Sequence, residues 1–316
     1  MKMKMSWFVG IFLLLLFLSL SSSSFADRPS SSQKPKHPSE RIIIGAKLKE
    51  YKPPAKRNCD IKVPSQFSTI QAAINSAENG NTICVGKGTY NEDLLVNKSI
   101  RLSGSGADKT TINGQGRTWP GTVYITAKDV TFEGFSINGV SASAAVQLAI
   151  TDSPYDSTIQ YNRIKSGYGA MALQLDGFQN TLAQNNIFEG NNSPHVVRES
   201  GGSFGRVDFL NNTFIGTVNP NERADTGITL DAGLPNGLIK RNVFNTTGTQ
   251  IMLIAPNGTS ILTENNFNSS VARKVVNGWP TTLNAVNNWW GDLDPSDNIQ
   301  GDVDFTPFAT HPFSQH

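Results

Sequence analysis

The sequence is poor in cysteine, with only Cys59 and Cys84 among 316 residues. That count excludes a small scaffold held together by many disulfides and a zinc module built from cysteine clusters. Charged residues are also scarce, at 16% of the chain, and the net charge is +2. Residues 1–58 carry eight net positive charges, whereas residues 59–316 carry six net negative charges. A basic body that binds nucleic acid is therefore disfavoured.

Long apolar runs are absent after the N-terminus. The N-terminus has a charged start at Lys2 and Lys4, an apolar run over 7–20, and small residues around Ala26. This pattern predicts a secretory signal peptide over 1–26. A membrane anchor is the alternative, but the run is shorter than the roughly 20 residues that span a bilayer. We expect an exported protein, located extracellularly, in a periplasm or in a cell wall, with no membrane span once the signal is removed.

Residues 27–58 are rich in serine, proline, lysine and arginine, which predicts a linker or a pro-segment. The dibasic pair at 56–57 could be a processing site, although a solvated basic arm is the simpler interpretation. In an exported protein the two cysteines, Cys59 and Cys84, are expected to form a disulfide. Asn-x-Ser/Thr sequons occur at Asn97, Asn191, Asn211, Asn245, Asn257 and Asn268. Chance alone explains about this many, so they carry little information about glycosylation.

Helical periodicity is missing after residue 80, whereas asparagine is abundant, with 30 copies. From about residue 120, asparagine recurs one or two positions before a large apolar residue, and a second short apolar strand lies between copies. The copies that contain asparagine are 161–164, 185–188, 211–214, 241–244, 265–267 and 287–290. A period of this size with two short strands per repeat predicts a β-solenoid, in which stacked coils supply the core. Asparagines at equivalent turns can then form a hydrogen-bonded ladder from coil to coil.

The stretch from Val63 to Ile74, followed by Gly80 and by 83–92, resembles the start of right-handed parallel β-helix domains with the pectin lyase-like fold. The resemblance extends over about residues 60–310. It implies a single all-β domain at 59–316, a right-handed parallel β-helix solenoid with a short N-terminal capping helix and a C-terminal cap.

The residues of the expected capping helix agree with that resemblance. Phe67, Ile70 and Ile74 fall on one helical face, Ser65 or Ser68 can cap the start, and Gly80 can end the helix. Near the C-terminus, the stretch 288–308 resembles the closing segment of secreted β-helix proteins. Its two tryptophans, Trp289 and Trp290, are expected to form an apolar lid rather than a platform for sugars.

Members of this family act on polyuronides as esterases, lyases, hydrolases or epimerases, and each activity has its own motifs. Gly88–Glu92 matches a Gly-x-Tyr-x-Glu turn near the start of pectinesterases, but many other β-helices share that turn. Val207–Leu210 is only a fragment of a second esterase motif, and the remaining motifs are missing. The sequence therefore leaves open whether the protein is an enzyme.

One group of acidic residues suggests where chemistry could take place. Asp176, Glu199 and Asp231 end equivalent strands, so we expect them to stack on three successive coils. Carboxylates about 5 Å apart cannot all ionise at low cost. Either one pKa is raised, which gives an acid and a base, or a cation such as calcium binds between them. The alternative without a functional site is that the three acidic residues belong to turns at the strand ends and face solvent.

Four further residues complete this candidate site. His195 could act as an acid or a base, and Arg198 interrupts an apolar position and could hold a uronate carboxylate. Gln147 and Gln174, expected on the outer face of adjacent coils, could bind sugar hydroxyls.

The sequence thus predicts a monomeric secreted β-helix that acts on or binds an extracellular polysaccharide. Modification of a polyuronide by a lyase, hydrolase or esterase activity is the favoured chemistry if the protein is catalytic. A non-catalytic glycan-binding or adhesion solenoid is the alternative, and a third is that the basic arm is the functional part. No row of outward aromatic residues is evident in the sequence.

Overall fold

The computed structural model describes residues 58–314, apart from 117–119, 141–142, 151–155, 178–179, 201–205, 217–225, 231–236, 247, 254–259 and 268–272. The predicted signal peptide, the basic segment up to residue 57 and Asp231 lie outside the described residues. The chain divides into units at Met1–Arg41 and Ile42–His316, and all described residues belong to the second. Within the described residues, no helix is both long and apolar enough to cross a membrane.

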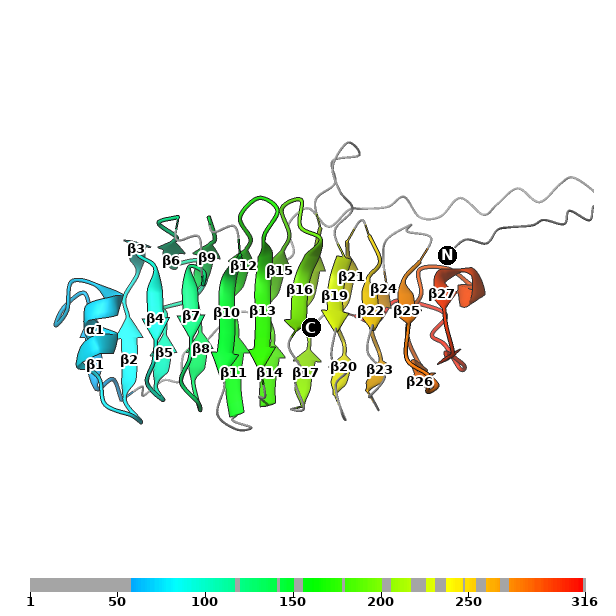
Figure 1. The fold of residues 1–316 in the computed structure, drawn as a ribbon, viewed down its shortest axis with the longest axis horizontal. Helices are drawn as coiled ribbons and strands as arrows, with labels where there is room; N and C mark the ends of the chain where they lie inside the picture. The colour runs from blue at the N-terminus through cyan, green and yellow to red at the C-terminus, as the bar shows by residue number, and fades with distance from the viewer. Residues whose placement is uncertain are drawn as a thin grey trace, which may run out of the picture. The chain divides into compact units, whose positions relative to one another are not determined.

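The described residues form a right-handed parallel β-helix in which each coil contributes strands to three parallel sheets (Figure 1). In spatial order, sheet A contains β1 (Ile61–Val63), β2 (Thr82–Val85), β5 (Arg101–Ser103), β8 (Thr131–Glu133), β11 (Asp156–Gln160), β14 (Asn180–Gln184), β17 (Val207–Leu210), β20 (Leu238–Lys240), β23 (Ile261–Thr263), β26 (Leu283–Asn284) and β28 (Val303–Asp304). Sheet B contains β3 (Gly88–Asn91), β6 (Thr110–Asn113), β9 (Ser136–Asn138), β12 (Arg163–Lys165), β15 (Ile187–Glu189), β18 (Thr213–Ile215), β21 (Val243–Asn245) and β24 (Asn266–Phe267). Sheet C contains β4 (Leu94–Val96), β7 (Val123–Ile125), β10 (Ala144–Ile150), β13 (Met171–Gly177), β16 (His195–Ser200), β19 (Thr226–Leu230), β22 (Ile251–Leu253), β25 (Val275–Asn277) and β27 (Ile299–Gln300).

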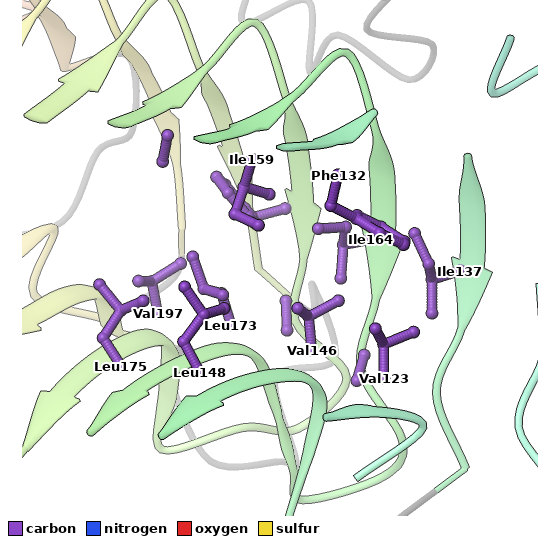
Figure 2. Close-up of a cluster of buried hydrophobic side chains, with 14 of the residues drawn as sticks. Val123, Phe132, Ile137, Val146, Leu148, Ile159, Ile164, Leu173, Leu175 and Val197 are labelled. Carbon is purple, nitrogen blue, oxygen red and sulfur yellow. The ribbon is translucent and has the colours of Figure 1, made fainter. Parts of the chain in front are cut away.

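Apolar side chains from all three sheets fill the interior of the solenoid, as Figure 2 shows for the central coils. The large apolar residue of each repeat forms a column beneath sheet B. Ring centroids in this column lie 5.4 Å apart for Phe188 and Phe214, 4.8 Å for Phe214 and Phe244, and 4.8 Å for Phe267 and Trp290. Each stacked pair stabilises the fold by about 0.5–1.5 kcal/mol beyond its buried area. The repeat therefore places its largest side chains where neighbouring coils bury them.

The predicted asparagine ladder is present between sheets A and B. The backbone N–H of Asn186 donates to Asn212 Oδ1 at 2.9 Å, and that of Asn212 donates to Asn242 Oδ1 at 2.9 Å. The same bond links the further rungs Asn162, Asn265 and Asn288. The residue before each rung has a positive φ, between 54° and 60°, and three of these six residues are asparagine, which tolerates that conformation better than most side chains. The rungs and the asparagines that precede them thus have a structural role.

Helix α1 (Ile70–Ser76) covers the N-terminal end of the solenoid. Its N-cap is Thr69, whose hydroxyl accepts from the backbone N–H of Ala72 at 3.2 Å. The expected caps Ser65 and Ser68 were therefore wrong, because the helix begins directly after Thr69. Its end was also misplaced: the chain leaves the helix at Ala77, before Gly80.

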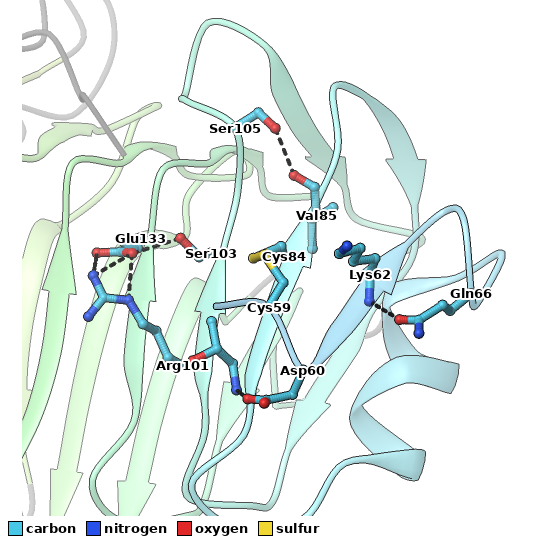
Figure 3. Close-up of a disulfide and its surroundings, with 11 residues drawn as sticks. Cys59, Asp60, Lys62, Gln66, Cys84, Val85, Arg101, Ser103, Ser105 and Glu133 are labelled. Carbon is cyan, nitrogen blue, oxygen red and sulfur yellow. Dashed lines mark hydrogen bonds and ion pairs between the residues drawn. A yellow bond between two sulfur atoms is a disulfide. The ribbon is translucent and has the colours of Figure 1, made fainter. Parts of the chain in front are cut away.

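Both ends of the solenoid are closed as expected. Cys59 and Cys84 form a disulfide that ties the first described residues to β2 (Figure 3). At the other end Trp290 is fully buried and contacts Phe267 and Phe305, which confirms its role as an apolar lid. Trp289 is partly exposed and pairs with Asn266 in an isolated bridge.

Candidate functional site on the outer face of sheet C

Sheet C carries a straight row of outward-facing residues, one from each coil, which we call the outer row. Except at the last member, Gln300, the residues on both sides of each member are buried in the core, as Val146 and Leu148 are around Gln147, so the member itself is on the outer face of the sheet. Cα pairing in exact parallel register aligns the members. In order they are Leu95, Tyr124, Gln147, Gln174, Arg198, Thr229, Met252, Val276 and Gln300.

Asp176 lies two residues after Gln174 on β13, on the same face of the sheet. Gln147 Nε2 donates to Asp176 Oδ2 at 2.7 Å, and Gln174 Nε2 donates to both carboxylate oxygens at 3.0 and 2.9 Å. Gln147 is fully buried and Gln174 is 8% exposed, whereas Asp176 is partly exposed. The two glutamines were expected to bind sugar hydroxyls, but in the structure they hold the carboxylate in place.

The structure corrects the predicted column of carboxylates. Glu199 pairs with Leu175 in the preceding coil and with Leu230 in the following coil, whereas Asp176 pairs with Ser200. Glu199 therefore points into the solenoid, and its side chain is fully buried. An offset of one residue along a strand turns a side chain to the opposite face of the sheet. Asp176 and Glu199 consequently do not form an acid and base pair on one surface.

The predicted cation site depends on the same column. In the described part of the chain, no three His, Cys, Asp or Glu side chains gather as metal ligands would. Asp231, the third predicted member, lies outside the described residues. The pair Asp176 and Glu199 therefore provides no shared surface on which calcium could bind.

Arg198 and His195 both lie on β16, next to the Asp176 strand. Arg198 pairs with Gln174 and Thr229, so it belongs to the outer row. The expectation that it interrupts an apolar position was therefore wrong. His195 is partly exposed, and its Nδ1 lies 2.7 Å from the hydroxyl oxygen of Thr229. The structure thus brings Asp176 and Arg198 to one face of the sheet and places His195 alongside Thr229.

Sequence reasoning missed Tyr124 as a member of this surface. Tyr124 pairs with Gln147, is partly exposed, and lies between the buried residues Val123 and Ile125. The alternation of that short strand was the available signal. The asparagine repeat does not point to Tyr124, because β7 precedes the first coil that has the asparagine pattern.

Glu92, from the Gly-x-Tyr-x-Glu turn, has a structural role. Its carboxylate accepts hydrogen bonds from the backbone N–H groups of Ile70 and Gln71, both at 2.9 Å. N–H groups in the first turn of a helix have no partner within the helix, and the helix dipole favours a negative charge there. The burial of Tyr90 raises its pKa, and its hydroxyl donates to the carbonyl of Gly86. The motif therefore docks the capping helix on the solenoid and is no evidence for esterase chemistry.

A second polar cluster surrounds Lys274 near the C-terminus. Its ammonium donates to Asn298 Oδ1 at 2.8 Å and to Asp292 Oδ2 at 3.2 Å. Burial lowers the pKa of Lys274, and the neighbouring Asp292 opposes that shift. Asp294 caps the short 3-10 helix η1 (Pro295–Asn298). These contacts hold the closing segment against β25.

No protein-family model matches the sequence. One curated relative, a cell surface glycoprotein of Methanothermus fervidus, is 36% identical over 115 residues. The match covers 34% of this chain and 18% of that protein, so the chain spans less than a fifth of its length. Among solved structures, rice weevil pectin methyl esterase has a TM-score of 0.50 at 13% identity, covering 81% of this chain and 92% of that one. Geobacillus virus E2 ORF18 has a TM-score of 0.53 at 17% identity, covering 69% of this chain and 52% of the other. At such identities these similarities establish the fold alone.

Proposed function

We propose that this right-handed parallel β-helix binds an extracellular polysaccharide on the outer face of sheet C, centred on Asp176. The observation that supports this most directly is the fixed Asp176 carboxylate, which two glutamines from successive coils hold at a partly exposed position. A carboxylate fixed in this way can accept hydrogen bonds from sugar hydroxyls without first losing side-chain freedom. The pectin methyl esterase with the same fold is consistent with a carbohydrate ligand.

The finer proposal is that the polysaccharide contains uronic acids. Arg198 lies in the outer row one coil beyond Gln174, and a guanidinium binds a carboxylate through two parallel hydrogen bonds. If the protein is catalytic, Asp176 and His195 are the groups that could move a proton. Elimination, hydrolysis and ester cleavage all remain candidate reactions. Glu199 is not among these groups, because it lies inside the solenoid.

Binding of the exported protein to a panel of uronic-acid and neutral polysaccharides tests the proposal. We expect Asp176→Asn to weaken binding of the preferred glycan. Asp156→Asn is the matched control, because Asp156 also accepts a hydrogen bond from a side-chain amide, that of Asn180, but lies on sheet A. Failure of every glycan to bind, or equal losses in the two variants, would contradict the proposal.

A non-catalytic surface module is the second candidate, favoured by the similarity to a cell surface glycoprotein. Product analysis separates the two candidates. A glycan that binds without release of methanol, unsaturated ends or reducing ends identifies a binding module, and any of those products identifies an enzyme. We also propose that the signal peptide is removed, which predicts an exported chain that begins at Asp27. A separate proposal is that the exported chain is a monomer, which sedimentation tests.

A further inference from the structure

The chain enters the solenoid on the outer face of sheet A. Cys84 occupies an outward position of β2, because its neighbours on both sides in that strand are buried. Its disulfide places Cys59 on the same side of the sheet, as Figure 3 shows. The segment that precedes residue 58 therefore joins the solenoid at the N-terminal end of this face.

The far half of the same face carries four outward-facing aliphatic side chains, which we call the aliphatic patch. They come from β14, β17, β20 and β23, successive strands of sheet A, and are Leu182, Leu210, Leu238 and Ile261. Each directly precedes or follows a buried residue of its strand, so each points away from the core. Ile261 is 42% exposed and the three leucines are partly exposed.

The near half of this face is different. Its outward residues on β5, β8 and β11 are all polar, namely Arg101, Ser103, Thr131, Glu133, Thr158 and Gln160. Apolar side chains are thus gathered on one part of the face. Such grouping is typical of a surface that packs against another segment.

Residues 42–48 have a pattern that complements the patch. Apolar residues alternate there with other residues at Ile42, Ile44, Ala46 and Leu48. An extended conformation would place these four side chains on one side, where removal from water stabilises them. All the isoleucine and leucine of residues 27–58 lies within 42–48.

The lengths of the segment and of the face allow them to meet. Strand β14 is four steps along sheet A from β2, about 19 Å, and the patch extends three steps further, about 14 Å. Eleven residues lead from Leu48 to Cys59 and can span up to about 36 Å when extended. Residues 42–48 span about 20 Å when extended, enough to cover the whole patch.

We propose that residues 42–48 pack in an extended conformation on the aliphatic patch, as a strap along the outer face of sheet A. The basic segment is then part of the folded domain, and neither a solvated arm nor a discarded pro-segment. Cleavage at the dibasic pair 56–57 would release the strap and expose the patch. The inference does not depend on the proposed glycan site, which lies on sheet C.

Amine cross-linking followed by mass spectrometry tests the position of the strap in the exported chain. Lys240 pairs with Leu210 on the outer face of sheet A, so it lies beside the patch. We expect Lys47 and Lys49 to cross-link to Lys240 and not to Lys165, which is exposed on sheet B. Absence of the link to Lys240, or equal linking to Lys165, would overturn the inference.

Ile261→Asp tests the apolar contact. Ile261 is exposed, so the substitution leaves the core intact, but a carboxylate disfavours apolar packing of the strap. We expect loss of the link to Lys240 and about tenfold faster trypsin cleavage after Lys47 and Lys49. Val140→Asp is the control, because Val140 is 54% exposed but lies beyond β9 of sheet B. Equal cleavage rates in the wild type and in both variants would contradict the strap.

A second copy of the chain is the other possible occupant of the patch, and sedimentation distinguishes the two. The strap predicts that the wild type and Ile261→Asp sediment alike. A wild-type dimer that Ile261→Asp dissociates would assign the patch to the second copy and overturn the inference.

Discussion

Gln174 donates hydrogen bonds to both carboxylate oxygens of Asp176, two residues further along the same strand, at 3.0 and 2.9 Å. Residues two apart on a strand share a face, so this bond requires only that β13 remain extended. The second donor, Gln147, comes from the preceding coil, and it ties the position of the carboxylate to the stacking of the solenoid.

Gln147→Leu is expected to reduce ligand affinity more than it reduces stability. The substitution removes a charge-assisted bond to Asp176, but it also removes Gln147 Oε1, a buried acceptor with no partner among the described residues. The gain offsets part of the loss, so we expect the free energy of unfolding to fall by no more than ~1 kcal/mol. Urea unfolding and glycan titration measure the two effects. A large loss of stability with intact binding would show that Gln147 does not position Asp176.

Asn212→Ala is expected to destabilise the fold strongly. The Asn212 side chain accepts from the N–H of Asn186 at 2.9 Å and donates to the carbonyl of Ala183 at 2.8 Å, and both contacts are buried. Alanine leaves these groups unpaired, at a cost of ~3 kcal/mol or more in the free energy of unfolding. Asn138→Ala is the control, because Asn138 is exposed and its bond to Asn113 is on the surface of sheet B. Denaturant unfolding should show a shift below ~1 kcal/mol for the control.

Glu264 provides a pH-dependent contribution to stability. A hydrogen bond from Lys240 lowers the pKa of Glu264 from 4.5, and Arg241 adds to the effect. Because the folded-state pKa is the lower one, the stabilisation is present above pH 4.5 and is lost as the pH falls through the folded-state value. Glu264→Gln should lower the free energy of unfolding at pH 7 by ~0.5 kcal/mol. That difference should vanish in acid, and a difference that persists there would exclude the ionic origin.

Reduction of the Cys59–Cys84 disulfide is expected to destabilise the N-terminal coil. The bridge closes a loop between cysteines 25 positions apart, for which chain entropy predicts ~3 kcal/mol. The double substitution of both cysteines by serine should show the same loss without reductant. The loss in the free energy of unfolding is measured by unfolding the wild type with and without reductant and comparing both with the variant. A variant whose stability still changes with reductant would contradict the role of this disulfide.

The period of the solenoid, its asparagine ladder and its buried aromatic column could be predicted from the sequence, because each coil repeats the same contacts. The candidate site was harder to predict. Glu199 and Asp176 both follow apolar runs, and the loops before β13 and β16 are equally long. The inward position that is Leu175 in β13 is Glu199 in β16, so counting from the end of the apolar run predicts the wrong register. Tyr124 belongs to a coil without the repeated asparagine. Side-chain direction at such positions depends on strand pairing, which composition does not reveal.

The ladder from Asn162 to Asn288 also bears on how this gene could change. Each rung between the two ends of the ladder presents the same acceptor to the coil before it and the same donor to the coil after it. A duplicated or deleted repeat would meet matching groups at both new junctions, since each coil contacts only its neighbours. Whole-repeat insertions in the sheet B turns should therefore be tolerated, whereas insertion of a single residue into a rung would interrupt the chain of amides. The solenoid can evolve in length by whole coils while its outer row stays in register.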